Sequence, residues 1–120
     1  MYNVIKIGEK GVPMLSMASV DVYYRQIFKE DPIKFLARKD RDEADAINFF
    51  NRMAYVMAEF AEKRDGREMA KLNEVTYTEW LCGFERNDLI NALPAVQMTY
   101  EGQSLTDTTA KKNKDEQTEK

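Results

Sequence analysis

The sequence contains no histidine, and this absence excludes several kinds of chemistry. Histidine is the commonest general base, it activates serine and cysteine nucleophiles, and many zinc sites need its imidazole as a ligand. The chain has one cysteine, Cys82, so neither an internal disulfide nor a thiolate cluster for a metal ion can form within it. We expect Cys82 to be a buried, inert thiol. Most hydrolase mechanisms and all imidazole-dependent zinc sites are therefore excluded.

Glycine is scarce as well, and its five positions match neither a Walker A loop nor a dinucleotide-binding motif. The acidic run Asp40, Asp42, Glu43 and Asp45 does not fit an EF-hand, because glycine is missing from the sixth position and glutamate from the twelfth. Carboxylates in this pattern are typical of a helix start, with Asp42 as the N-cap. We therefore expect no catalytic residue, no cofactor and no metal, and hence no enzyme.

Long hydrophobic runs are also missing. No apolar segment approaches the length that crosses a bilayer, and the first residues lack the charged and apolar regions of a signal peptide. The 18 basic and 21 acidic residues give a net charge of −3, which is too close to neutral to drive binding to a polyanion by long-range field alone. A composition of 43% hydrophobic and 32% charged residues is typical of a soluble globular protein, and we expect a reducing cytoplasm as its location.

The composition changes near residue 100, which predicts two regions. Residues 1–100 are rich in aromatic and aliphatic side chains and are expected to form a single, mainly helical domain. Residues 101–120 carry one large apolar side chain, Leu105, and cannot bury enough surface to offset the entropy of ordering the chain. We expect this second region to be a disordered, charged tail.

The domain itself is predicted to begin with a β-hairpin. Two β-prone runs between Tyr2 and Met17 flank the four-residue connection Gly8–Gly11, and Pro13 suits an edge strand because it has no N–H to donate. Apolar residues at intervals of three and four then predict four to five helices. Pro94 is expected to kink or split the last of them. The expected fold class is α+β, with the hairpin packed on a bundle of helices.

The longest periodic stretch, from about residue 43 to residue 63, has a wider apolar face than one contact requires. This helix is therefore either central or has a side that faces a partner. Methionine fills irregular cores and also suits surfaces that accept varied partner helices, so the seven methionines leave both interpretations open. If the second holds, aspartate at position 49 or 53 abolishes partner binding and leaves the fold intact. The candidate partner-binding residues are Phe49, Met53, Val56, Met57 and Phe60.

The order of these elements resembles that of the tail assembly chaperones of long, non-contractile-tailed phages that infect Gram-positive bacteria. The likeness covers about residues 1–100 and includes the N-terminal hairpin, the aromatic helix Val20–Phe28, the segment Glu30–Pro32 and the stretch Tyr77–Leu81. It implies a non-enzymatic protein that binds the helical tape measure protein, keeps it soluble and helps to recruit the tail tube protein. It also implies a location in the host cytoplasm and absence from the mature virion.

Two other functions remain open at this point. The first is a small helical regulator that binds nucleic acid, and the second is a structural component of the head–tail region. The basic residues between positions 34 and 41 would serve the regulator, although two aspartates lie among them. A homo-oligomer is compatible with any of the three functions. The basic residues in question are Lys34, Arg38, Lys39 and Arg41.

Overall fold

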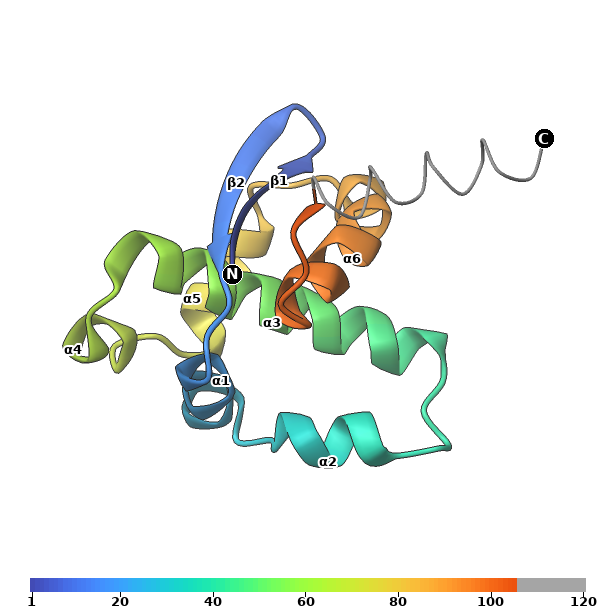
Figure 1. Ribbon diagram of the computed structural model, residues 1–120, viewed down its shortest axis with the longest axis horizontal. Coiled ribbons are helices and arrows are strands. Elements are labelled where there is room, and N and C mark those ends of the chain that lie inside the picture. The colour runs from blue at the N-terminus through green and yellow to red at the C-terminus, as the bar shows by residue number, and fades with distance from the viewer. Residues whose placement is uncertain (106–120) are drawn as a thin grey trace.

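A computed structural model describes residues 1–105, and within this range the chain forms a hairpin followed by six helices (Figure 1). The predicted α+β class is confirmed, and the additional helix is a single short turn. The elements in chain order are β1 (Tyr2–Ile7), β2 (Lys10–Leu15), α1 (Ser19–Phe28), α2 (Pro32–Ala37), α3 (Glu43–Lys63), α4 (Gly66–Met69), α5 (Glu74–Leu81) and α6 (Arg86–Tyr100).

The hairpin turns over two residues, which is tighter than the four-residue connection expected from the sequence. Gly8 has φ 65°, and glycine at the first position of a two-residue turn matches the natural twist of the flanking strands. β1 and β2 pair antiparallel, with Tyr2 opposite Leu15 and Ile7 opposite Lys10. Alternate residues of β1, beginning with Asn3, face the protein interior, so the hairpin covers the helices with one face and leaves the other to solvent.

Helix α3 is the central element, and β2, α6 and α1 all pack against it (Figure 1). Its start is held by a capping box. The Asp42 carboxylate accepts a hydrogen bond from the Asp45 N–H at 2.8 Å, and the Asp45 carboxylate accepts one from the Asp42 N–H at 3.2 Å. The predicted N-cap is thus confirmed. At the other end Arg64, with φ 49°, takes the left-handed conformation that closes the helix.

The start of α5 is also held by a capping box. Asn73 caps α5, because its side-chain oxygen accepts hydrogen bonds from the N–H groups of Val75 and Thr76 at 2.8 and 3.0 Å. The Thr76 hydroxyl in turn accepts a hydrogen bond from the Asn73 N–H at 2.9 Å. Helix α6 continues through Pro94, so the predicted split is wrong. Pro94 lies on the exposed side of α6, where the lost hydrogen bond costs least because solvent can reach the freed carbonyl.

The fold extends beyond the predicted boundary at residue 100. The side-chain amide of Asn3 donates hydrogen bonds to the Thr99 hydroxyl at 2.9 Å and to the Gln103 carbonyl at 3.0 Å, and Leu105 packs against the core. The expected tail therefore begins too early at residue 101. Its remainder, residues 106–120, lies outside the described residues.

Candidate functional site

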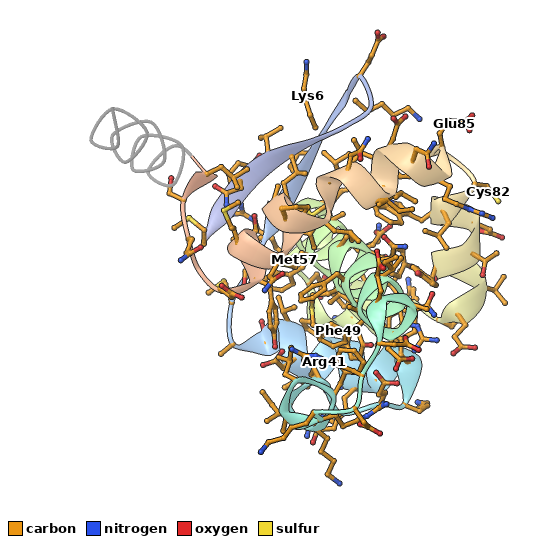
Figure 2. All side chains as sticks on the ribbon, turned by 90° about the vertical axis from the view of Figure 1, so that its right-hand side faces the viewer. Lys6, Arg41, Phe49, Met57, Cys82 and Glu85 are labelled. Atoms are coloured by element: carbon orange, nitrogen blue, oxygen red, sulfur yellow. The ribbon has the colours of Figure 1, made fainter. Side chains whose placement is uncertain are left out.

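The five candidate partner-binding residues of α3 lie in the core of the protein. Their exposed fractions are 1% for Phe49, 0% for Met53, Val56 and Met57, and 9% for Phe60. The interpretation of these side chains as an exposed docking surface is therefore wrong. Figure 2 shows Phe49 and Met57 inside the molecule rather than on its rim.

The reason is that α3 is surrounded. The Phe49 ring stacks on Phe35 of α2 at 4.4 Å between centroids and lies 5.2 Å from Tyr24 of α1, while Phe60 lies 5.5 Å from Tyr23. The hairpin and α6 also pack against α3, and only toward its N-terminal end does a large aliphatic residue of the helix, Ile47, stay partly exposed. The width of the apolar face thus reflects a central position, which is the first of the two interpretations that the sequence allowed.

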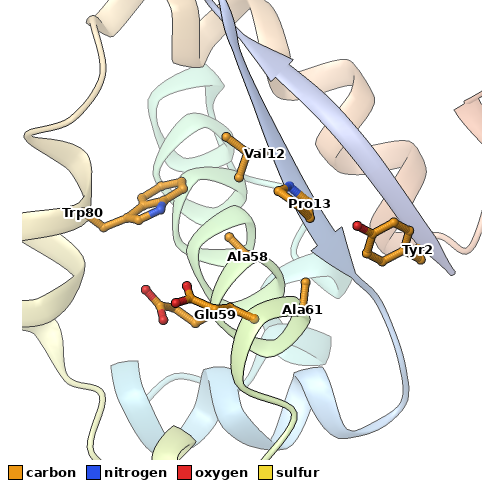
Figure 3. Close-up of a pocket in the computed structure, with 8 residues that line it drawn as sticks. Tyr2, Val12, Pro13, Ala58, Glu59, Ala61 and Trp80 are labelled. Atoms are coloured by element: carbon orange, nitrogen blue, oxygen red, sulfur yellow. The ribbon is translucent and has the colours of Figure 1, made fainter.

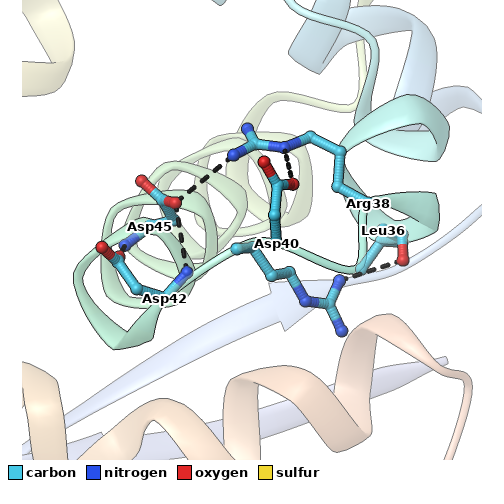
Figure 4. Close-up of polar contacts among 6 residues, drawn as sticks. Leu36, Arg38, Asp40, Asp42 and Asp45 are labelled. Atoms are coloured by element: carbon cyan, nitrogen blue, oxygen red, sulfur yellow. Dashed lines mark hydrogen bonds and ion pairs between the residues drawn. The ribbon is translucent and has the colours of Figure 1, made fainter.

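Two of the four basic residues between positions 34 and 41 are bonded within the chain, while Lys34 and Lys39 are exposed. The Arg38 guanidinium contacts the carboxylates of Asp40 at 3.1 Å and Asp45 at 3.5 Å, and Arg41 donates to the Leu36 carbonyl at 3.1 Å (Figure 4). The hydrogen bond from Arg38 lowers the pKa of the Asp40 carboxyl below its usual value. Part of the positive charge available for a phosphate backbone is therefore neutralised within the chain.

One part of the apolar surface that remains open is a groove of about 540 Å³ between three helices. The N-terminal half of α3 forms one wall through Ile47, and α5 with the loop after it contributes Leu81 and Phe84. Helix α6 closes the groove with Leu89 and Ile90. Only Leu89 is fully buried, so the other four side chains present apolar surface to whatever enters the groove. We call this feature the α3–α5–α6 groove, and its other lining residues are Ala44, Asn48, Asn51 and Arg86.

The polar residues of this groove give it some specificity. Arg86 is exposed at the start of α6 and is a cation at the groove wall. The side-chain oxygen of Asn51 is buried and has no hydrogen-bond partner within residues 1–105. Buried polar atoms without a partner are rare in native proteins, but an oxygen that is closed to solvent is equally closed to a molecule in the groove. The groove is therefore largely apolar, with one cation, Arg86, at its wall.

A second hollow of about 400 Å³ lies between the hairpin and the opposite part of α3 (Figure 3). Ala58 and Ala61 form its floor, and Val12, Pro13 and Trp80 stand on its two sides. Glu59 also lines it, but its carboxylate is already paired with Lys63 at 2.9 Å, a contact that raises the pKa of the lysine. This hollow is more polar than the α3–α5–α6 groove.

The single cysteine lies at the surface, whereas the hydroxyl groups of two tyrosines are shielded from solvent. Cys82 is exposed, so the expectation of a buried thiol is wrong: it follows the last turn of α5, on the outer side of the loop to α6. Burial raises the pKa of the Tyr77 hydroxyl to about 12. Burial also raises the pKa of Tyr24, with a further contribution from the nearby Glu30 carboxylate. These tyrosines therefore stay protonated at neutral pH.

Neither a metal centre nor a membrane-spanning helix is present among residues 1–105: no group of three or more potential ligands converges, and no helix is both long and apolar enough. The residues of the α3–α5–α6 groove were each recognisable as apolar positions of separate helices. What the sequence lacked was any signal that these helices leave a groove between them.

In comparisons with known proteins, no family model, no curated protein and no solved structure matches this chain.

Proposed function

We propose that this protein is a phage tail assembly chaperone that binds the tape measure protein and keeps it soluble while the tail tube assembles. The proposal rests on the resemblance in element order described above and on one structural observation, the open α3–α5–α6 groove. In this proposal the protein is not an enzyme. It acts in the host cytoplasm, helps to recruit the tail tube protein and is absent from the mature virion.

The binding mode is a helix in a groove. An amphipathic helix presents side chains at intervals of three and four residues, and such a stripe fits an apolar channel between helices. Ile47, Phe84 and Ile90 would contact that stripe. Arg86 would pair with an acidic residue at the edge of the bound helix. This site replaces the buried residues that the sequence indicated, while the mode of binding stays the same.

The test is co-expression of the full chain with the tape measure protein of the same genome, followed by measurement of the soluble fraction and of affinity for tape measure segments. Ala44 is exposed and lines the groove, so Ala44→Trp fills the groove without touching the core. We expect at least about a tenfold loss of affinity, or about 1.4 kcal/mol. Ala70→Trp, at an exposed alanine that does not line the groove, is the matched control and should bind normally.

Two results would contradict the proposal. The first is a tape measure protein that stays insoluble with the wild-type chain, and the second is equal binding by Ala44→Trp and the control. The regulator alternative predicts DNA affinity that falls steeply with salt, which the internal pairing of Arg38 disfavours. The structural alternative predicts that the protein is found in purified virions.

A further inference from the structure

The two edges of the hairpin can be told apart from the hydrogen bonds at its open end. The Ser16 N–H donates to the Met1 carbonyl at 2.8 Å, and the Met1 amine donates to the Ser16 carbonyl at 2.7 Å, so these two residues form a hydrogen-bonded pair. Such pairs alternate along an antiparallel ladder with pairs whose main-chain groups point outward. In the observed register the outward-pointing residues are Tyr2, Val4 and Lys6 on β1 and Gly11, Pro13 and Leu15 on β2.

These edges differ in whether another strand can join them. On β2 the central outward position is Pro13, which has no N–H, and proline is one of the residues that protect an edge from pairing. On β1 all three outward residues have an N–H, and no side chain or main-chain group within residues 1–105 bonds to them across that edge. Helix α6 packs against β1, and the side chain of Asn3, on the buried face of the strand, bonds to Thr99 of α6. The outward main-chain groups of β1 are unpaired within residues 1–105, and no proline interrupts their row as Pro13 does on β2.

All three side chains beside this edge are exposed, and two of them are apolar or aromatic. Tyr2 and Val4 have exposed fractions of 50% and 54%, and Lys6 extends away from the body of the molecule (Figure 2). Met1 and Met17, at 41% and 57%, extend the apolar surface beyond the strand end. An exposed apolar strand with free main-chain groups is a recognised site of association.

We propose that β1 pairs with β1 of a second copy of this chain, antiparallel, about a two-fold axis at Val4. The two hairpins then form one four-stranded sheet across the dimer. In this register Val4 faces Val4 of the partner subunit, and Tyr2 faces Lys6 of the partner subunit. All outward main-chain groups of the strand are used, with two hydrogen bonds exchanged in each facing pair.

Repulsion between lysines favours this register over the alternative in which the two-fold axis lies at Lys6. Sliding the strands so that the axis falls at Lys6 places two ammonium groups opposite each other, which is unfavourable. Centring on Val4 keeps the lysines apart and lays each lysine stem beside a tyrosine ring. Because the contact is one six-residue strand, the interface is smaller than the typical 1,600 Å². We therefore expect a weak dimer, with a dissociation constant in the micromolar range or above.

Sedimentation equilibrium of the full chain tests this dimer. The wild type should shift from 14.0 kDa to about twice that mass as its concentration rises through the expected dissociation constant. Val4→Pro removes the central N–H of the new ladder but no hydrogen bond to β2, so it should stay monomeric with an unchanged circular dichroism spectrum. Val4→Thr keeps the N–H and the β-branched shape, and this control should dimerise like the wild type.

If Val4→Pro does not fold, a pair of charge variants tests the β1–β1 dimer instead. Tyr2→Lys places a second cation opposite Lys6 of the partner subunit and should weaken dimerisation about tenfold or more at low salt, whereas Tyr2→Glu should preserve or tighten it. A wild type that remains monomeric near millimolar concentration overturns the proposal. So does dimerisation that neither Val4→Pro nor Tyr2→Lys affects. The α3–α5–α6 groove contains no β1 residue, so failure here leaves the proposed function standing.

Discussion

The most direct test of the corrected role of α3 is the replacement Phe49→Ala. The Phe49 side chain is 1% exposed and lies within 4.4 to 6.3 Å, between ring centroids, of Tyr24, Phe35, Phe50 and Tyr100. Removing a buried phenylalanine ring typically costs about 3–5 kcal/mol, because transfer energy is lost and a cavity remains. Since a domain of this size is stable by about 5–15 kcal/mol, the variant should lose a large share of its stability.

Urea and thermal unfolding followed by circular dichroism measure this loss. A loss of 3–5 kcal/mol corresponds to a fall in Tm of about 10–20 °C for a chain of this length. The control Ile33→Ala removes an apolar side chain that is 58% exposed, and it should change the free energy of unfolding by less than about 0.5 kcal/mol. A loss below about 1 kcal/mol for Phe49→Ala would refute the core assignment and restore the interpretation of Phe49 as a surface anchor.

Three further predictions concern the turn, the helix cap and the buried tyrosines. Gly8→Ala should destabilise the fold by about 1–2 kcal/mol in urea unfolding, because φ is 65° and the new Cβ would lie 2.6 Å from an Asp88 oxygen; an unchanged midpoint would contradict the turn geometry. Asp42→Ala should cost about 1 kcal/mol by the same measurement, whereas Asp42→Asn should retain most of the cap. Stability should fall as pH rises above about 10, the unfolded tyrosine pKa, because folded Tyr77 keeps its proton up to about 12. Tyr77→Phe should flatten this decline in urea midpoints measured between pH 8 and pH 11.5, and an equal decline in the two proteins would argue against a perturbed Tyr77.

Local features of the fold were readable from the sequence because they depend on a few neighbouring residues. The hairpin follows from two β-prone runs around Gly8, and the start of α3 follows from the Asp42 carboxylate beside free N–H groups. The cap of α5 is not decided by local preference, because Asn73 and Thr76 both suit an N-cap. The start of the tail was placed too early because Gln103 is fastened by Asn3, a residue almost the whole chain away.

The candidate site was predicted least well, and the reason is physical. Hydrophobic periodicity shows that α3 has a wide apolar face, but it does not show which element covers that face. Phe49 is covered by α2 and α1, and this arrangement depends on how the chain returns after Ala37. Cys82 is exposed for a similar reason, since its apolar neighbours Leu81 and Phe84 point to the groove and the thiol does not.

The sequence by itself determined what this protein is made of and what it lacks: no imidazole chemistry, no phosphate loop, a β-hairpin and a series of amphipathic helices. Those properties depend on residue identity and on spacing over one or two helical turns. Only the tertiary structure decided that Phe49 and its neighbours on α3 are covered, that a groove stays open between α3, α5 and α6, and that the outward main-chain groups of β1 are unpaired within residues 1–105. Burial and strand pairing are relations between segments distant in the chain, and no local pattern encodes which segment will cover another.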